Sequence, residues 1–375
     1  MKGPKILAVA SAVDLDFRYG CTPAWWQLWK ALHQAGCDLI VTPYRGRPVE
    51  SPWWRTAPNP CYREGETFAT LRDFVARVKG DRYLRRAERD PGDTDRWVRE
   101  AIWRWVTPRW RRHLVDLLER ERDVDAVVVF TVPMSLPEFG GHDAGFNYYY
   151  GADPSEYDLV LSNSEGGLER LRELGASRAE AVFWGADPEL FQPLPVDKET
   201  DVFFYGSGDK FRQEWMEAMI GEPSRRLPGV DFSLGGEDFR GDIGSARVVG
   251  DVPFNVFARA ISAARINLNV TRRAHALVYA SSTSRPFELA MAGAAIVSNP
   301  HEGIERWFEP GRELLVVENA DEAVAAYREL LDDLGRAEEL GRAARERALD
   351  EHTFLHRARR VLDLLGVGVP EAVRG

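Results

Sequence analysis

Cysteine is scarce in this chain of 375 residues, which contains only Cys21, Cys37 and Cys61. Because their number is odd and no pair has C-x-x-C spacing, the sequence predicts neither a disulfide framework nor a zinc site. Long apolar runs are missing as well. The stretch from Ile6 to Val13 is too short for a secretory core, and no later run approaches the length of a membrane span. We therefore expect a soluble, cytoplasmic protein.

Positive charge is also in deficit, because 49 lysines and arginines face 59 aspartates and glutamates, which gives a net charge of -10. This balance disfavours nucleic acid bound across a broad face, but it leaves room for a local basic pocket that binds a small phosphate ligand. The dinucleotide fingerprint G-x-G-x-x-G is missing too, since none follows residues 6–10 and Gly206 and Gly208 lack the third glycine. A nicotinamide-dependent dehydrogenase is therefore disfavoured.

The chain contains the pattern that begins a Rossmann-like domain twice. Residues 5–12 and 201–208 each read as a buried strand that runs into a polar or glycine-bearing loop and then a helix. Strands and helices alternate after each beginning, and the chain is longer than one hydrophobic core usually supports. The pattern predicts an α/β protein with two Rossmann-like domains, each a doubly wound parallel sheet. Further strands are predicted at 38–42, 126–130, 159–162 and 266–270 and near 232 and 248, and helices at 67–78, 97–120, 167–175, 213–220, 253–264 and 354–365.

One segment, residues 82–112, departs from this alternation because it combines many arginines with Trp97, Trp103, Trp105 and Trp110. Basic and aromatic helices can lie on a membrane surface or contact an apolar acceptor. Tryptophans at helical spacing more often pack in a core, and acidic residues within the segment dilute its positive charge. Packing is therefore the favoured interpretation, with membrane contact as the open alternative.

The segment Ser284–Asn299, S-R-P-F-E-L-A-M-A-G-A-A-I-V-S-N, gives the clearest chemical signal. Ser284 can cap a helix, and Pro286 suits its first turn because the missing N–H has no intrahelical partner there. Phe287 continues the apolar run and Gly293 ends the helix. The short apolar run after Gly293 predicts a buried parallel strand.

Arg285 and Glu288 stand in the first turns of this predicted helix. Free N–H groups at a helix start, with a cation beside them, form an anion site. The Glu288 carboxylate, about one turn later, could accept two hydrogen bonds from a vicinal diol such as a ribose. The alternative is that Glu288 merely responds to the helix dipole while Arg285 is a solvated surface charge. The first interpretation predicts a site for a nucleoside diphosphate.

Three motifs together resemble those of the two-domain GT-B glycosyltransferases, especially the spore-maturation-protein-like (CgeB-type) branch related to the large retaining family four. These motifs are R-P-F-E-L-A-M-A-G-A-A-I-V-S at 285–298, F-W-G-A-D-P-E-L-F-Q-P at 183–193 and F-E-P-G-R-E-L-L-V-V at 308–317. The resemblance implies two Rossmann-like domains that face each other across a cleft. It assigns an acceptor domain to 1–185, a linker to 186–200, a nucleotide-sugar domain to 201–352, and to 353–375 a helix that crosses back to the first domain.

For the donor, the resemblance implies binding by Ser284, Arg285, Pro286, Phe287 and Glu288. It adds a close backbone approach at Gly206 and Ser207, pyrophosphate-binding cations at Lys210 and Arg212, and an aromatic wall for the base at Phe254. Glu288 matches the later member of the family's pair of glutamates. The earlier member is missing, because Ala280 stands at its position. This departure weakens the expected sugar contact and the expectation that the stereochemistry is retained.

For the acceptor, Tyr19, Gly20, His142 and Asp153 are expected in loops that open towards the cleft. Asp153 could act as a base towards an acceptor hydroxyl, although an Asp-Pro step is more often a turn former. His142 is either a base near neutral pH or an ordinary loop histidine. If stereochemistry is retained, an oxygen of the departing phosphate could take the proton, so that no enzymic base is required.

The prediction is therefore a hexosyltransferase-like GT-B enzyme that takes a UDP- or GDP-linked sugar as donor and needs no cofactor. Its catalytic residues would be Arg212, Glu288, Asp153 and His142. Its acceptor would be a small molecule, a glycan or a protein. We expect no metal, because the D-x-D matches at 14–16, 93–95 and 123–125 do not fall at convincing strand ends. The alternative is a non-catalytic protein that binds nucleotide-sugars or serves in an assembly.

Overall fold

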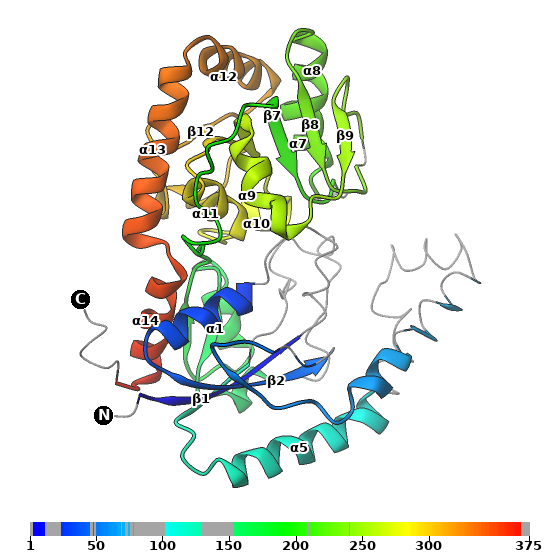
Figure 1. Ribbon diagram of the computed structural model, residues 1–375, viewed down its shortest axis with the longest axis vertical. Helices are drawn as coiled ribbons and strands as arrows, with labels where there is room; N and C mark the ends of the chain where they lie inside the picture. The colour runs from blue at the N-terminus through cyan, green and yellow to red at the C-terminus, as the bar shows by residue number, and fades with distance from the viewer. Residues whose placement is uncertain are drawn as a thin grey trace. The chain divides into compact units, whose positions relative to one another are not determined.

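The computed structural model describes residues 3–11, 24–45, 48, 50–68, 70–71, 74–75, 78, 102–129, 153–208, 211–239 and 241–368. The chain divides into two compact units, which are treated separately below (Figure 1). Unit 1 takes residues 1–16, 28–153 and 358–375, and unit 2 takes residues 17–27 and 154–357. Residues 154–185 thus group with unit 2. The domain boundaries expected from the sequence stay predictions.

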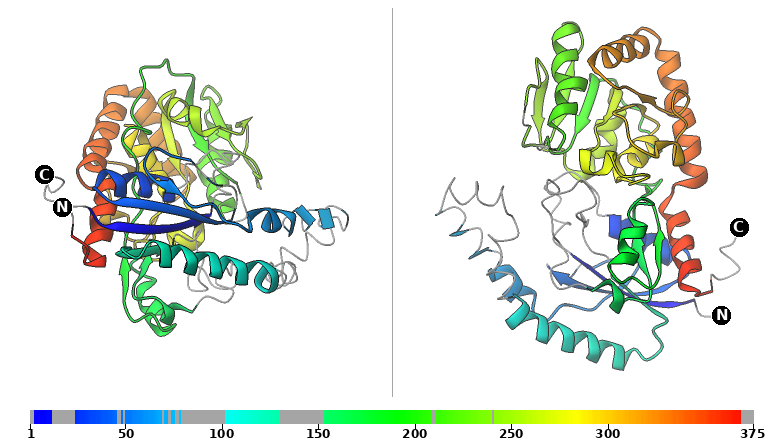
Figure 2. Two further views of the ribbon diagram at one scale, coloured as in Figure 1. Left: turned by 60° about the horizontal axis from the view of Figure 1, so that its bottom comes forward. Right: turned by 180° about the vertical axis from the view of Figure 1, so that it is seen from behind.

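Unit 1 is built on a parallel sheet with the strand order β3-β2-β1-β4. Its strands are β1 (Lys5–Ser11), β2 (Asp38–Arg45), β3 (Arg55–Thr56) and β4 (Ala126–Val129). The helices α1 (Ala24–Gln34) and α5 (Thr107–Arg120) lie on opposite faces of this sheet (Figures 1 and 2), and the π-helical turn Ile102–Val106 precedes α5. Because both faces are covered, β1 is apolar along its length, from Ile6 to Val9.

The third D-x-D match, at 123–125, contacts the first residue of β1. The Lys5 ammonium contacts Glu121 and Asp123, both over 2.6 Å, and the Lys5 backbone N–H donates to Asp125 over 2.8 Å. Arg55 contacts the second oxygen of Glu121 over 2.8 Å. Asp123 and Asp125 therefore join the turn before β4 to the start of β1. The matches at 14–16 and 93–95 lie outside the described residues.

Unit 2 contains a parallel sheet with the order β12-β11-β10-β7-β8-β9. Its strands are β7 (Thr200–Tyr205), β8 (Phe232–Gly235), β9 (Arg247–Gly250), β10 (Ala264–Asn269), β11 (Ala295–Ser298) and β12 (Leu315–Val316). The chain builds outwards from β7 through β8 and β9 (Figure 1), then returns to place β10 on the other side of β7. The point between β7 and β10 is the topological switch point, where doubly wound sheets bind ligands.

Successive side chains of β7 point to opposite faces of the sheet and pack in two separate cores. Val202 and Phe204 of β7 pack on one face with residues of α12 (Ala320–Asp332). Phe203 and Tyr205 pack on the other face with residues of α9 (Phe254–Ser262) and α11 (Ser284–Met291). Both faces of this sheet are therefore buried, and Tyr205 belongs to the face that α11 covers.

The other described elements of unit 2 are short or lie near the C-terminus. They are the 3-10 turns Pro154–Glu156 and Ile304–Arg306, the helices α6 (Leu168–Glu173), α7 (Gln213–Met216), α8 (Glu222–Arg226), α10 (Arg273–Ala276) and α13 (Leu334–Glu351), the π-helical turn Glu217–Gly221, and the strands β5 (Val160–Ser162) and β6 (Ala179–Ala181). The last helix, α14 (Phe354–Leu365), begins in unit 2 and continues into unit 1. The strand predicted at 159–162 is thus present as β5, but it pairs with β6 in a sheet of its own. The part of the chain that the structure describes contains no helix long and apolar enough to span a bilayer.

Candidate functional site

The candidate site lies at the switch point, where β7 and β10 end side by side. Strand β7 ends at Tyr205, and Gly206 follows with a φ of 132°. A Cβ at Gly206 would collide with the guanidinium of Arg285. Glycine is therefore required here for two reasons: the backbone conformation disfavours other residues, and the arginine side chain occupies the space that a Cβ would need.

Two buried arginines converge on one backbone carbonyl, that of Val270 just after β10. Nε of Arg212 donates to this oxygen over 2.8 Å, and Nη1 of Arg285 donates to it over 3.0 Å. Arg212 also donates to the Ser207 carbonyl and Arg285 to the Tyr205 carbonyl, each over 2.7 Å. Both arginine residues are 8% exposed. Carbonyl oxygens at the ends of the strands therefore hold two cations at the switch point.

The guanidinium of Arg285 lies over the rings of Phe204 and Tyr205, with its carbon 4.8 Å from each ring centroid. Burial is the main cause that lowers the pKa of Arg285, and Arg272 acts in the same direction. The charge of Glu288 and contacts with Tyr205 oppose this lowering. The site thus concentrates positive charge where little water can screen it, which favours an anionic ligand.

Glu288 lies one turn after Arg285 in α11 and is fully buried. The hydroxyl of Tyr205 donates to Oε2 of Glu288 over 2.7 Å, and among the described residues Oε1 has no hydrogen-bond partner. Burial raises the pKa of the Glu288 carboxyl, while the Tyr205 hydroxyl, the charge of Arg285 and the Ser284 side chain lower it. Tyr205 therefore holds one carboxylate oxygen, and the other has no hydrogen-bond partner among the described residues.

Arg272 and His275 join this cluster, although sequence reasoning did not single them out. The Arg273 N–H donates to the Phe211 carbonyl over 2.9 Å, which places the start of α10 beside the residue before Arg212. Burial lowers the pKa of His275, and the charges of Arg272, His301 and Arg212 lower it further. The sequence did offer one signal, the position of R-R-A-H at 272–275, two residues after the end of the strand predicted at 266–270.

The start of α11 differs from the sequence expectation. Thr283, not Ser284, is the N-cap residue, and its side chain forms no capping hydrogen bond. The segment before the helix is held instead by the loop after β5, since Asn163 donates to the Ser282 carbonyl over 2.8 Å and Ser282 donates back over 2.9 Å. Tertiary contacts therefore replace the expected side-chain cap, whereas Pro286 does lie in the first turn as predicted.

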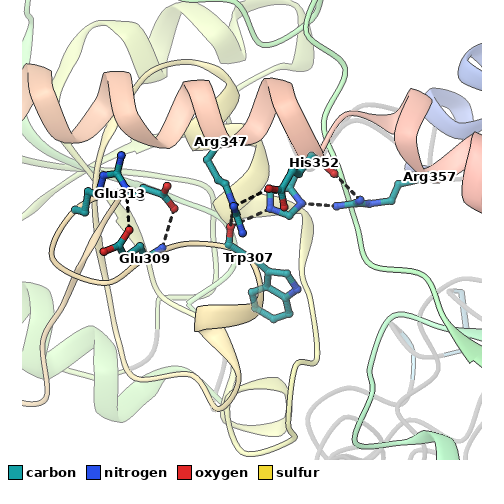
Figure 3. A network of polar contacts seen from close by, with 8 residues as sticks. Trp307, Glu309, Glu313, Arg347, His352 and Arg357 are labelled. Atoms are coloured by element: carbon teal, nitrogen blue, oxygen red, sulfur yellow. Dashed lines mark hydrogen bonds and ion pairs between the residues drawn. The ribbon is translucent and has the colours of Figure 1, made fainter. Parts of the chain in front are cut away.

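Phe287 packs in the core rather than beside the arginines. Its ring contacts the rings of Trp307, Phe308 and His352 at centroid distances of 5.8, 5.6 and 5.1 Å. Figure 3 shows His352 between Trp307 and Arg357: its Nε2 contacts the Trp307 carbonyl over 2.9 Å and its Nδ1 accepts from Arg357 over 2.8 Å. Burial lowers the pKa of His352 to about 3, which matches a neutral ring that donates through Nε2 and accepts through Nδ1.

Ala280, which stands where the resemblance places an earlier glutamate, is buried and has a φ of 48°. This left-handed conformation is uncommon for residues other than glycine. The Ala280 N–H donates to the Glu302 carbonyl over 2.8 Å, which holds the conformation. A methyl group offers no polar atom to a sugar, so the described site has a single glutamate where the glycosyltransferases that the sequence resembles have two.

Of the other predicted site residues, Asp153 alone has a described side chain. Asp153 is exposed and precedes the 3-10 turn at 154–156. Phe254 begins α9, but its side chain is outside the description. Tyr19, Gly20, His142 and Lys210 lie outside the described residues. Within the described ranges, no group of three His, Cys, Asp or Glu residues is placed to hold a metal ion.

Residues 212–363, which include most of this site, match a family model described as glycosyl transferase-like. The chain matches no curated protein. Among solved structures, sucrose-phosphate synthase from Thermosynechococcus elongatus is similar over 96% of this chain and 98% of its own, with 16% identity and a TM-score of 0.59. Trehalose-6-phosphate synthase OtsA is similar over 98% of this chain and 100% of its own, with 15% identity and a TM-score of 0.62. HepE of Anabaena in complex with UDP-glucose is similar over 96% of this chain and 99% of its own, with 12% identity and a TM-score of 0.55.

The chain has the GT-B fold. The predicted fold class, an α/β protein of two Rossmann-like domains, is thereby confirmed. The strand order around β7 is the order that this fold class requires. Membership of the CgeB-type branch stays a prediction.

Proposed function

We propose that this protein transfers a sugar from a nucleoside-diphosphate sugar to an acceptor hydroxyl. One observation carries the proposal: Arg212 and Arg285 converge on the Val270 carbonyl at the switch point, one turn away from the buried carboxylate of Glu288. A cation pair and a carboxylate at this spacing suit the two ends of a nucleoside diphosphate. The glycosyl transferase-like match and the UDP-glucose complex of HepE, which has a similar fold, support it.

In this proposal the arginines act on the leaving group. When the bond between the anomeric carbon and the diphosphate breaks, negative charge accumulates on the departing oxygen. Arg212 and Arg285 would stabilise this charge because they are already oriented and only weakly screened by water, and the charge of Arg272 adds to theirs. Backbone carbonyls fix the first two, so little reorganisation is needed during reaction.

Glu288 would bind the ribose of a UDP- or GDP-linked donor. Its unpartnered Oε1 can accept a charge-assisted hydrogen bond from a ribose hydroxyl, which is stronger than a bond between neutral groups. Arg285 would mark the phosphate end of the site and Glu288, one turn later in α11, the ribose end. The proposal thus assigns opposite ends of the nucleotide to the two residues.

We further propose that no divalent metal takes part and that the stereochemistry is retained. Three guanidinium groups supply the positive charge that a metal would otherwise bring to the diphosphate. With retention, the acceptor oxygen attacks from the side of the departing diphosphate, and its proton passes to an oxygen of that leaving group. Turnover that is unchanged in excess EDTA, and proton NMR of the product's anomeric centre, test the two statements.

The central test is a calorimetric screen of UDP, GDP, ADP and dTDP, followed by turnover measurements with the sugar conjugate of the tightest ligand. Binding with slow donor hydrolysis, accelerated by a suitable acceptor, is the expected result. Binding without hydrolysis or transfer would favour the non-catalytic alternative, for which the missing glutamate at Ala280 is the supporting observation. Absence of binding to all four nucleotides would contradict the proposal itself.

A further inference from the structure

Tyr205 contacts two charged residues of the candidate site, Arg285 and Glu288. Its hydroxyl donates to Oε2 of Glu288 over 2.7 Å, and its backbone carbonyl accepts from Arg285 over 2.7 Å. Its ring lies under the same guanidinium, with 4.8 Å between the guanidinium carbon and the ring centroid. A single residue at the end of β7 therefore contacts the groups proposed for the phosphate end and the ribose end of the donor.

The direction of the Tyr205 hydroxyl is fixed by packing. Phe257 of α9 meets the Tyr205 ring edge to face with 3.8 Å between the centroids, and the Phe203 ring stacks at 6.3 Å with an interplanar angle of 29°. All three side chains belong to the same buried core. Because aromatic rings in a close-packed core keep one rotamer, the hydroxyl has a fixed orientation towards α11.

We propose that Tyr205 is a positioning residue that holds Oε2 of Glu288 and so presents Oε1 to the ribose of the nucleotide. This inference rests on the proposed function and deepens it, since it names the residue that determines how the ribose is recognised. Without the hydroxyl, the carboxylate would lose the hydrogen bond that holds Oε2. It would then rotate or take up a proton, and either change weakens a charge-assisted bond to the ribose.

The charges around Glu288 make this pairing measurable without a ligand. Burial raises the pKa of the Glu288 carboxyl from its usual 4.5, and three groups oppose burial: the Tyr205 hydroxyl from β7, and the Arg285 guanidinium and Ser284 side chain from α11. Arg272, after β10, acts on Arg285. Removing the Tyr205 hydroxyl should raise the pKa of Glu288 further, because one group that favours the ionised form is lost.

Tyr327 provides a matched control for Tyr205. It is also fully buried in the same unit, and its hydroxyl donates over 2.7 Å, but to the backbone carbonyl of Met219 instead of a carboxylate. Tyr205→Phe and Tyr327→Phe each remove one oxygen atom and one buried hydrogen bond. General losses of stability should therefore be alike, and only the first variant should affect a titrating group.

The first experiment measures the free energy of unfolding of both variants by chemical denaturation between about pH 5 and about pH 8. A carboxyl whose pKa in the folded state is raised destabilises the fold progressively as the pH rises above the unfolded value. The loss caused by Tyr205→Phe should therefore grow with pH, whereas the loss caused by Tyr327→Phe should stay constant. Equal pH dependence of the two variants would overturn the pairing.

The second experiment measures the affinity for UDP, or for GDP if GDP binds more tightly, and for its 2′-deoxy and 3′-deoxy analogues by calorimetry. The wild type and Tyr327→Phe should prefer the parent nucleotide to at least one analogue by about tenfold or more. In Tyr205→Phe this preference should fall to about threefold or less, because the recognising oxygen is no longer held.

Each outcome has a distinct meaning. If Tyr205→Phe weakens the parent nucleotide and both analogues by one common factor, its role is merely structural and the proposal is overturned. If the wild type binds neither UDP nor GDP while the pH-dependent difference persists, the proposed function and the ribose role are both overturned. The interaction between Tyr205 and Glu288 would then stand as a stabilising contact alone.

Discussion

Arg212 and Arg285 share one acceptor, the carbonyl oxygen of Val270, at distances of 2.8 and 3.0 Å. Two like charges this close repel each other, and burial makes the repulsion more costly. The fold nevertheless holds both side chains with backbone carbonyls at the ends of β7 and β10. A cost of this kind is expected where a protein binds an anion.

Replacement of Arg212 should chiefly slow the transfer step. Arg212→Ala is expected to lower kcat by about a hundredfold with a smaller effect on KM, because charge on the leaving group grows during reaction. Arg212→Lys should recover only part of the rate, since an ammonium cannot reproduce the fork that contacts Val270 and Ser207. Arg259→Ala, which removes an exposed arginine paired with Glu199, is the control. An unchanged kcat in Arg212→Ala would remove this residue from the mechanism.

Replacement of Glu288 should weaken nucleotide binding. Glu288→Gln keeps the size of the side chain but removes its charge, and we expect calorimetry to show a loss of affinity of about tenfold or more. Glu313→Gln is the matched control, because that buried carboxylate accepts a bond from the Glu309 N–H and has no assigned ligand role. Undiminished affinity in Glu288→Gln would show that the ribose is recognised elsewhere.

A side chain at position 206 should damage both the fold and the site. In Gly206→Ala the new methyl group meets the guanidinium of Arg285, and the positive φ adds backbone strain. We expect a loss of about 1–3 kcal/mol in the free energy of unfolding, together with weaker nucleotide binding. Gly229→Ala has open space around its Cβ and should stay within about 0.5 kcal/mol of the wild type. Equal stability of the two variants would show that Arg285 moves aside without cost.

Acid should selectively remove the contribution of Glu121 to the stability of unit 1. Hydrogen bonds from Arg55 and Lys5 lower the pKa of Glu121 from 4.5 to about 2, so its contribution is complete above about pH 4.5 and is lost as the pH falls towards 2. Glu121→Gln should therefore be less stable than the wild type at neutral pH, and the difference should shrink on acidification. Glu119→Gln, which changes an exposed glutamate in the last turn of α5, should change neither quantity. A difference that stays constant with pH would argue against these ion pairs.

Local signals in the sequence predicted the region around α11 well. The helix from Ser284 and its end at Gly293 match the structure, because a proline in the first turn and a glycine with a φ of 69° act through their own backbone geometry. The strand predicted after Gly293 is β11. The predicted cap at Ser284 was wrong because contacts of Asn163 with Ser282, which no local pattern encodes, hold that segment.

Other features could not be predicted from local patterns. The strand predicted at 159–162 exists, but its partner β6 had no recognisable signal because that strand is only three residues long. The helix predicted at 213–220 includes a π-helical turn at 217–221, which depends on packing and not on helix propensity. The predicted roles of Asp153 and Phe254 stay predictions, as do those of the four site residues that lie outside the description.

The sequence by itself determined where strands and helices alternate, which strands are buried on both faces, and that Arg212, Arg285 and Glu288 stand at the starts of helices. Only the tertiary structure decided that β10 returns to lie beside β7, which brings Val270 to both arginines and Tyr205 to a glutamate 83 residues away. The physical reason is that helices and turns depend on near neighbours in the chain. The pairing of distant strands depends on how the whole sheet buries its two faces.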